Sequence, residues 1–270
     1  MSEATVTAPP PYDRPYAPAR SPFLWLLERE IVRFLKLWRF SIVGQILAAL
    51  LFVLVFGVAL KGRVEAIHGI PYDRFILPGL LVQATITVGF VNGTTSLFEA
   101  RNDRYIHRVL ASPLRWWEIN LGLVIGGIVR ELLVGGGVIV IAGPLVGIGI
   151  ARPLVFCLAI LALLVSGAQL GVIAGTYARS LDDIYSLETL VVLPLGFLSG
   201  IFYSVTKLPE TWQVLSYLNP VFYFVEAIRA GLLGHADLSP AISLTVVTGI
   251  AVALTAWSLA LFRSAKQLKP

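Results

Sequence analysis

The stretch PLVFCLAILALLVSGAQLGVIAGTYA, residues 153–178, contains no charged side chain. A helix needs about 20 apolar residues to cross the ~30 Å hydrocarbon core of a bilayer, and this run is longer than that. The rest of the chain agrees, because 57% of its 270 residues are hydrophobic and only 14% are charged, against about 25% in soluble domains. Apolar and polar residues do not alternate in the run, so we predict an integral membrane protein built of helices rather than barrel strands.

Five further runs extend this pattern, so the fold class that we predict is an all-α membrane protein with six transmembrane helices. The predicted spans are Phe40–Leu60, Phe75–Phe98, Ile119–Ala151, Pro153–Ala178, Ile184–Thr206 and Leu238–Phe262. Residues 1–21 are rich in Pro and lack an apolar segment, which predicts a disordered tail rather than a signal peptide. We expect residues 22–270 to form one transmembrane domain.

The distribution of Lys and Arg predicts the orientation of this domain. With six spans both termini lie on one side of the membrane, and that side carries 14 Lys and Arg residues against 6 on the other. Positive residues are enriched in cytoplasmic loops. We therefore expect both termini, and the tail, to be cytoplasmic.

An amphipathic helix is predicted over residues 22–39, beginning at Ser21-Pro22. Its apolar arc comprises Leu24, Leu27, Ile31, Phe34, Leu35 and Trp38. A basic polar face with Trp opposite it is typical of a helix lying in the bilayer interface. The helix either only anchors the chain at the membrane surface before the first span, or transmits movement between the membrane domain and a cytoplasmic partner, or does both. Its candidate functional residues are Trp25, Glu28, Arg29, Arg33, Lys36 and Trp38.

The loop after the second span, residues 99–114, is too long and too patterned for a simple turn. Tyr105 and Val109 form a short apolar stripe among charged residues, and Pro113 ends the predicted helix. The loop is either a cytoplasmic docking helix or a solvated loop that follows the positive-inside rule. The candidate residues are Glu99, Arg101, Asn102, Asp103, Arg104, Tyr105, Ile106, His107, Arg108, Leu110, Ser112 and Pro113.

Residues 207–234 predict two short helices rather than a span. Leu208–Leu218 is too short to cross a bilayer, and Asn219-Pro220 separates it from Val221–Leu233. Two half-length helices around a break predict a re-entrant hairpin on the outer side, between the fifth and sixth spans.

Polar residues inside the predicted spans and the hairpin are candidates for the translocation path or a gate. They are Gln83, Asn92, Arg130, Glu131, Phe202, Tyr203, Glu226 and Arg229. Arg130 and Glu131 have three interpretations: pairing with the amphipathic helix or the docking loop, lining the path, or snorkelling to the inner interface. Glu226 and Arg229 are three residues apart, so they form a local ion pair or act at the outer mouth. Gly167, Gly171 and Gly175 are a small-residue series that favours close helix packing.

Three motifs resemble those of ABC-2 type permeases. The coupling segment of that family resembles Phe98-Glu99-Ala-Arg followed by Leu110-Ala-Ser-Pro-Leu114. Its second signature resembles Leu198-Ser-Gly-Ile-Phe-Tyr-Ser204, and its third resembles Leu218-Asn-Pro220 with Glu226-Ala-Ile-Arg229. The resemblance runs from about Trp25 to the C-terminus. It is nearest to the branch that exports drugs, nodulation factors and polysaccharides.

This resemblance implies the permease subunit of an ABC exporter in the bacterial inner membrane, for a lipidic, amphipathic or glycan-type substrate. Two copies of a separate ATPase would bind ATP and Mg, and the partner permease would be an identical chain. The sequence agrees, because it contains no Gly-x-x-x-x-Gly-Lys-Ser/Thr phosphate loop. An alternative is a membrane-embedded lipid-handling enzyme, and another is a passive channel or scaffold.

No metal, cofactor or nucleic-acid site is predicted in the chain itself. The three histidines, His68, His107 and His235, fall in loops on two sides of the membrane, and Cys157 is the single cysteine. The cytoplasmic positive charge is explained by topology.

Overall fold

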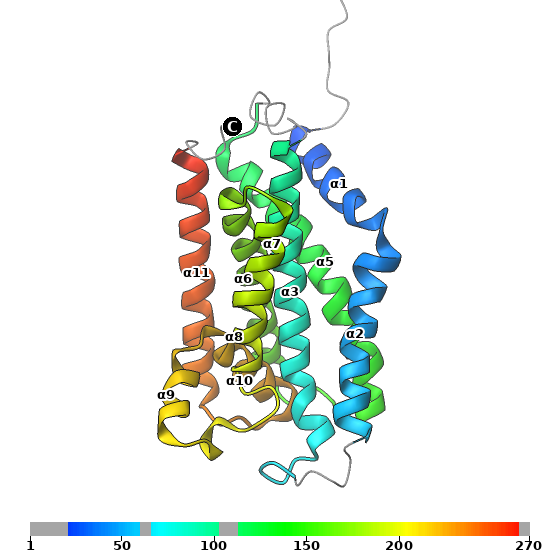
Figure 1. Cartoon of the computed structure of the whole chain (residues 1–270), viewed down its shortest axis with the longest axis vertical. Helices are drawn as coiled ribbons and strands as arrows, with labels where there is room; N and C mark the ends of the chain where they lie inside the picture. Colours follow the sequence, from blue (N-terminus) through cyan, green and yellow to red (C-terminus); the bar gives the residue numbers. More distant parts are fainter. Residues whose placement is uncertain (1–20, 60–65, 103–112, 265–270) are drawn as a thin grey trace, which may run out of the picture.

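The computed structural model describes residues 21–59, 66–102 and 113–264, and most of these residues are helical (Figure 1). The described residues contain no strand, and one isolated bridge joins Ile67 to Ile70. The helical segments are α1 (Pro22–Leu35), η1 (Arg39–Val43), α2 (Gly44–Phe52), η2 (Val53–Ala59), α3 (Tyr72–Asn102), α5 (Trp116–Val146), α6 (Pro153–Tyr177), α7 (Leu181–Leu187), η3 (Glu188–Val192), α8 (Leu193–Phe197), η4 (Val205–Lys207), α9 (Glu210–Leu218), α10 (Pro220–Leu233) and α11 (Pro240–Ser264). The predicted all-α class is confirmed for this part of the chain.

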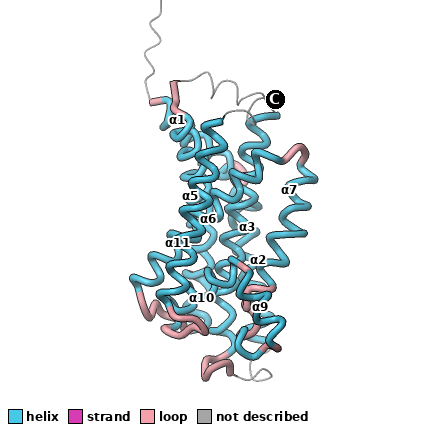
Figure 2. Tube along the Cα trace, turned by 90° about the vertical axis from the view of Figure 1, so that its left-hand side faces the viewer, coloured by secondary structure: helices cyan, strands magenta, loops and turns pink. Residues whose placement is uncertain are grey.

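Five helices in the described residues are long and apolar enough to cross a membrane. They are Arg39–Phe56, which runs through η1, α2 and part of η2, and the helices α3, α5, α6 and α11. They run along the long axis of the bundle (Figures 1 and 2). Each coincides with one of the six predicted spans. In the remaining prediction, Ile184–Thr206, the continuous helical run ends at Phe197, the chain turns at Gly200, whose φ is 75°, and the short helix η4 begins at Val205.

Helices α3 and α6 form the centre of the bundle. In their most apolar windows 78% and 67% of the residues are buried, against 11% in Arg39–Phe56 and 17% in α11. Glycines permit the close approach, because a Cβ on Gly171 would lie 2.5 Å from the Phe90 carbonyl oxygen. The predicted packing role of the Gly167–Gly175 series is therefore confirmed. The peripheral helices present apolar faces outward, as lipid contact requires.

Helix α1 begins where the sequence predicts, with Ser21 as its N-cap and Pro22 in its first turn. Leu26, Glu30 and Phe34 form its buried stripe and pack on α5. A Cβ on Gly122 of α5 would lie 2.8 Å from Leu26 Cδ2. Most of the predicted apolar arc lies outside this stripe, and Leu24 is 53% exposed. The prediction of one apolar and one polar face therefore omitted a third face, which packs on the protein. The predicted apolar face is largely exposed beside it.

Helices α9 and α10 lie at the end of the bundle opposite the start of α1 and the end of α11 (Figure 1). They occupy the positions of the two predicted short helices. Asn219 separates them: its Oδ1 accepts from the Val221 N–H at 2.9 Å, and its Nδ2 donates to the Leu195 carbonyl at 2.6 Å. Most of α10 is buried, whereas α9 is mostly exposed.

Candidate functional site

The buried carboxylate of Glu30 anchors α1 to α3. Its Oε1 lies 2.7 Å from Arg29 Nη1, and its Oε2 accepts from the Ser96 hydroxyl at 2.5 Å. Arg33 Nε lies 3.5 Å from the same Oε2. The Glu30 side chain is 0% exposed, and a buried charge is tolerated only where it is paired and hydrogen-bonded. Glu30 is not among the predicted functional residues of this helix, because it belongs neither to the predicted apolar arc nor to the predicted basic face.

Two arginines from different elements meet at Asn92 in the middle of α3. Arg33 Nη2 donates to Asn92 Oδ1 at 2.9 Å and to the Asn92 carbonyl at 3.0 Å. Arg130 Nη1 donates to the same Oδ1 at 3.3 Å, and its Nη2 donates to the Ser41 carbonyl at 3.2 Å. This Arg33–Asn92–Arg130 cluster joins α1, η1, α3 and α5. It brings one predicted interfacial residue together with two predicted path residues.

The Glu131 side chain lies in the α3–α6 contact, against Gly89 and Gly167. It is 0% exposed, and a Cβ on Gly167 would lie 3.1 Å from either carboxylate oxygen. Neither oxygen has a hydrogen-bond partner among the described residues. Arg130 is also buried, at 8% exposure. The snorkelling interpretation of the two side chains is therefore wrong, because small residues on α3 and α6 leave room for Glu131 inside the bundle.

The described part of the predicted coupling segment is tied to the bundle. Arg101 Nη1 donates to the carbonyls of Gly175 at 3.2 Å, Thr176 at 3.1 Å and Ala178 at 3.1 Å, so it caps the end of α6. Glu99 Oε2 lies 3.5 Å from Arg33 Nη1. Asn102 and Pro113 are exposed. The other predicted residues of this segment lie outside the described residues, namely Asp103, Arg104, Tyr105, Ile106, His107, Arg108, Leu110 and Ser112.

Arg33, one of the predicted interfacial residues, reaches α3 through Asn92, Thr95 and Glu99. Arg29 contacts the neighbouring Glu30, and the Arg39 guanidinium lies 5.7 Å from the centroid of the Trp38 ring. Trp25, Glu28, Lys36 and Trp38 are exposed. The interfacial role of these four side chains stays a prediction.

A groove of about 230 Å³ lies between α2, α3 and the α7–α8 region. The predicted path residues Gln83 and Phe202 both line it, together with Glu188 and otherwise mainly apolar side chains. A Cβ on Gly196 would lie 1.6 Å from Gln83 Oε1, so a larger residue there would displace the Gln83 amide from its present position. The structure thus brings two of the candidate residues to one surface.

Glu226 and Arg229 form a buried ion pair at the end of the bundle opposite α1. Arg229 Nη2 donates to the Gly200 carbonyl at 2.8 Å, and its guanidinium lies 4.0 Å from the centroid of the Phe75 ring. Glu226 Oε2 accepts from the Leu238 N–H at 3.0 Å. The predicted local ion pair is confirmed, and it also ties α10 to two other segments. Two other candidates for the path or gate are Phe202, whose carbonyl accepts from the Tyr72 hydroxyl at 3.3 Å, and Tyr203, which is partly buried.

The comparison with protein families matches the chain over residues 21–233 to the ABC-2 type transporter family. The chain belongs to this family. The Inner membrane transport permease YadH of Escherichia coli K12 is 35% identical over 233 residues, covering 86% of this chain and 91% of the relative. The Nodulation protein J of Sinorhizobium fredii is 30% identical over 207 residues, with 73% and 77% covered. The Nodulation protein J of Rhizobium leguminosarum bv. trifolii is 27% identical over 197 residues, with 72% and 75% covered.

Family membership confirms the resemblance that the three motifs carried. The matched range begins at the N-cap of α1 and ends at the last residue of α10. It therefore contains α1, the coupling segment, the groove residues and the Glu226–Arg229 pair of this ABC-2 transporter chain.

Proposed function

We propose that this ABC-2 transporter chain is the permease subunit of an ATP-driven exporter in the bacterial inner membrane. Support comes from the family, from the names of its relatives, and from the five long apolar helices. The observation that carries the mechanism is the end of α3. Arg101 there binds the last carbonyls of α6, and Glu99 and Asn92 bind Arg33 of α1.

This arrangement supports transmission of force from a cytoplasmic partner. Residues 103–112 follow α3 directly, and the last turns of α3 are joined by polar contacts to both α1 and α6. A displacement applied at 103–112 would therefore move three helices as a unit, which is a rigid-body mode of switching. We propose that the residues 99–114 dock two copies of a separate ATPase, which bind ATP and Mg, and that the permease itself has no catalytic residue.

The membrane topology that we propose has six crossings with both termini in the cytoplasm. The continuous run α7–η3–α8 would be the fifth crossing, and α9 and α10 would be a re-entrant pair at the outer surface. Support comes from the Lys and Arg distribution of 14 against 6. The tail, residues 1–21, would lie on the cytoplasmic side, followed by one transmembrane domain.

A second, identical permease would complete the path for a lipidic, amphipathic or glycan-type substrate. The groove that contains Gln83 and Phe202 is flanked by exposed apolar side chains of α2 and η3–α8, such as Leu51 and Leu190. Two such faces opposed in a dimer would enclose a mainly apolar passage with few polar groups. Glu226 and Arg229 would hold its outer mouth.

Charge reversal in the coupling segment tests this proposal. With Arg104→Glu and Arg108→Glu together, we expect loss of ATPase binding and of ATP-dependent export in proteoliposomes, while membrane insertion is retained. The matched control is Arg263→Glu, a charge reversal at the end of α11. If the 104/108 double variant still assembles with coupled ATP hydrolysis, the docking assignment is wrong.

The same vesicles separate the alternative functions. A passive channel or scaffold would give equal substrate flux with and without the ATPase. A lipid-handling enzyme would turn over lipid without ATP. We expect neither, and we expect efflux only when the ATPase and ATP are both present.

A further inference from the structure

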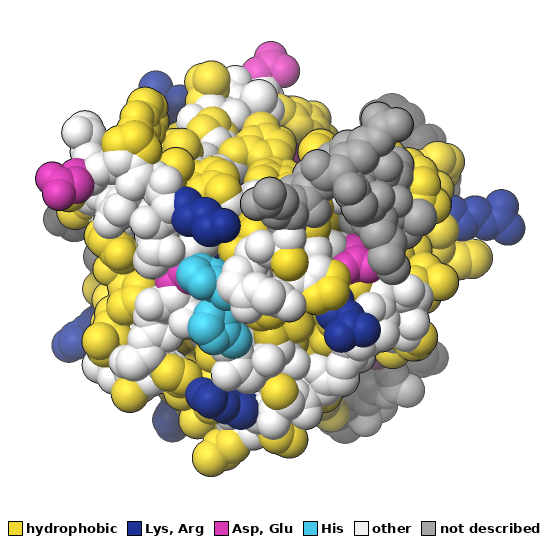
Figure 3. All heavy atoms as spheres, turned by 90° about the horizontal axis from the view of Figure 1, so that it is seen from below, with side chains coloured by type: hydrophobic (Ala, Val, Ile, Leu, Met, Phe, Trp, Pro, Cys, Tyr) yellow, Lys and Arg dark blue, Asp and Glu magenta, His cyan; other side chains and the backbone are white. Residues whose placement is uncertain are grey.

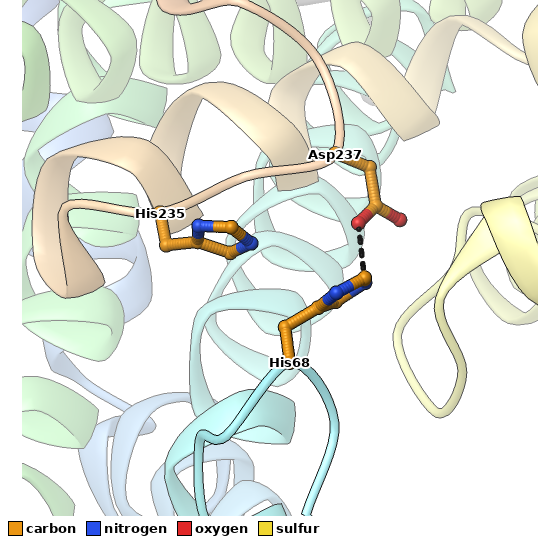
Figure 4. A group of neighbouring side chains, drawn as sticks. All are labelled: His68, His235 and Asp237. Carbon is orange, nitrogen blue, oxygen red and sulfur yellow. Dashed lines mark ion pairs between the residues drawn. The ribbon is translucent and has the colours of Figure 1, made fainter.

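Three side chains that can ligate a metal ion meet at the end of the bundle opposite α1 (Figure 4). His68 precedes α3, whereas His235 and Asp237 lie in the connection between α10 and α11. One ligand atom from each residue lies within 4.8 Å of the other two. We propose that His68, His235 and Asp237 bind a divalent transition-metal ion, with Zn²⁺ as the best match.

The distances fit the size of a zinc site. Zinc–ligand bonds of about 2.0–2.2 Å in a tetrahedron place neighbouring ligand atoms about 3.3 Å apart. His68 Nε2 and Asp237 Oδ1 are 3.1 Å apart, close to that value. The widest pair needs to close by at most about 1.5 Å. His235 is exposed, so its side chain can rotate to do so.

The carboxylate is already oriented by Ser204, whose hydroxyl oxygen also lies 3.1 Å from His68 Nε2 and therefore contacts two of the three ligands. The Ser204 hydroxyl donates to Asp237 Oδ2 at 2.6 Å, which leaves Oδ1 toward His68. The Asp237 side chain is only 4% exposed, and the next residue, Leu238, is held by Glu226. Hydrogen bonds of this kind fix metal ligands in position and raise affinity.

The backbone holds His68 in an uncommon conformation. Its φ is 52° and that of Gly69 is 75°, and the Ile67–Ile70 bridge closes this two-residue turn. A non-glycine residue at positive φ is disfavoured, and such residues gather at functional sites. The turn brings the imidazole toward the α10–α11 connection (Figure 4).

The donor set selects the class of ion. Two imidazoles and one carboxylate suit Zn²⁺, Cu²⁺ or Ni²⁺, whereas Mg²⁺ and Ca²⁺ prefer oxygen ligands. Histidine side chains reach the surface at this end (Figure 3), so an ion can enter from solvent and a water molecule can fill the fourth position. Arg229 lies within electrostatic range of Asp237, but its charge is paired with Glu226. A bound ion would join the segment before α3 to the α10–α11 connection, independently of the transport proposal.

Zinc titration of the purified full chain tests the site. The protein carries a histidine-free affinity tag and Cys157→Ser, and a chromogenic chelator competes for Zn²⁺. We expect one Zn²⁺ per chain, with at least about 10-fold weaker binding for His68→Ala, His235→Ala and Asp237→Asn. Ser204→Ala should weaken binding by about 10-fold and keep the stoichiometry. His107→Ala is the matched control, because it removes the third histidine of the chain, and its binding should be unchanged.

Several outcomes would overturn the proposal. They are the absence of saturable Zn²⁺ binding, unchanged binding in His68→Ala or His235→Ala, and equal loss in His107→Ala. To separate ligand loss from misfolding, each variant is compared without metal by gel filtration and melting temperature. Cobalt provides a test on the unsubstituted histidines: Co²⁺ should give the intense visible absorption of a tetrahedral site, and Zn²⁺ should displace it. If the added Co²⁺ kept the weak spectrum of the free hydrated ion and stayed with the buffer on gel filtration, no ion would be bound, and the His68–Asp237 contact would be only a metal-free pair.

Discussion

Buried ionised side chains join the outer helices of this permease to its centre. Glu30 is bound by Ser96 and two arginines, and Arg229 by Glu226 and a carbonyl. Leaving one partner of such a pair buried alone is strongly destabilising. Their contribution is therefore measured best by removing one partner at a time.

Glu30→Ala should destabilise the protein by about 3–5 kcal/mol, because it leaves Arg33 and Ser96 without their buried partner. The free energy of unfolding in detergent measures this loss. Asp182→Ala, which removes an exposed carboxylate at the start of α7, should change it by less than about 0.5 kcal/mol. Equal effects of the two substitutions would show that the Glu30 network adds no stability.

Sequence patterns identified some of these residues and missed others for a definite reason. Arg33 is predicted as part of the polar face of an amphipathic helix, and Asn92 and Arg130 are predicted as polar groups inside apolar spans. Their convergence on one amide oxygen involves residues 59 and 38 positions apart. No local periodicity carries that information. The prediction omitted Glu30 because it divided the helix into a lipid-facing side and a solvent-facing side. It had no side that packs on other helices of the protein.

Helix ends were more predictable than helix partners. Ser21-Pro22 and Asn219-Pro220 act through local backbone chemistry, and helices begin at Pro22 and Pro220. The fifth predicted span was too long because the uncharged residues 198–204 are not helical: Gly200 adopts φ 75° and its carbonyl accepts from Arg229. Hydropathy measures composition and does not detect such a turn.

The contact between α1 and α5 depends on glycine. A Cβ on Gly126 would lie 2.6 Å from Glu30 Cβ, whereas one on Gly136 of the same helix meets nothing within 4 Å. Gly126→Leu should therefore lower the free energy of unfolding by about 1–3 kcal/mol through overpacking. It should also weaken ATPase coupling by displacing Arg33. Gly136→Leu is the matched control, because Leu raises helix propensity equally at both positions, and a similar loss in both would mean that the α1–α5 contact is not responsible.

In the part of the chain that the structure describes, the bundle has five helices long enough to cross a bilayer and one shorter run, α7–η3–α8. The chain crosses the membrane six times if the two ends of this run lie on opposite sides, and five times if they lie on the same side. Asp182 and Glu210 flank it, and both are exposed. They are therefore suitable positions for labelling.

Single cysteines at these two positions test the proposed crossing in a Cys157→Ser background. In intact cells, a membrane-impermeant maleimide should label the Glu210→Cys variant. It should label the Asp182→Cys variant only after the membrane is opened. Labelling of both from the same side would contradict a crossing by α7–η3–α8.

The amino-acid sequence alone was sufficient for the membrane class, the five long helices, the paired short helices and the family. These follow from hydropathy, helix-breaking residues and local motifs, which act over one or two helical turns or over one span. The partners of Glu30, the glycine-lined surroundings of Glu131 and the His68–His235–Asp237 group are defined only by the packed bundle. Such contacts depend on which helices approach one another and how they are rotated, and glycines on α3, α5 and α6 control that approach. A polar side chain in an apolar run indicates a desolvation cost on burial. The groups that bind such a side chain lie on other segments of the chain, so only the tertiary structure identifies them.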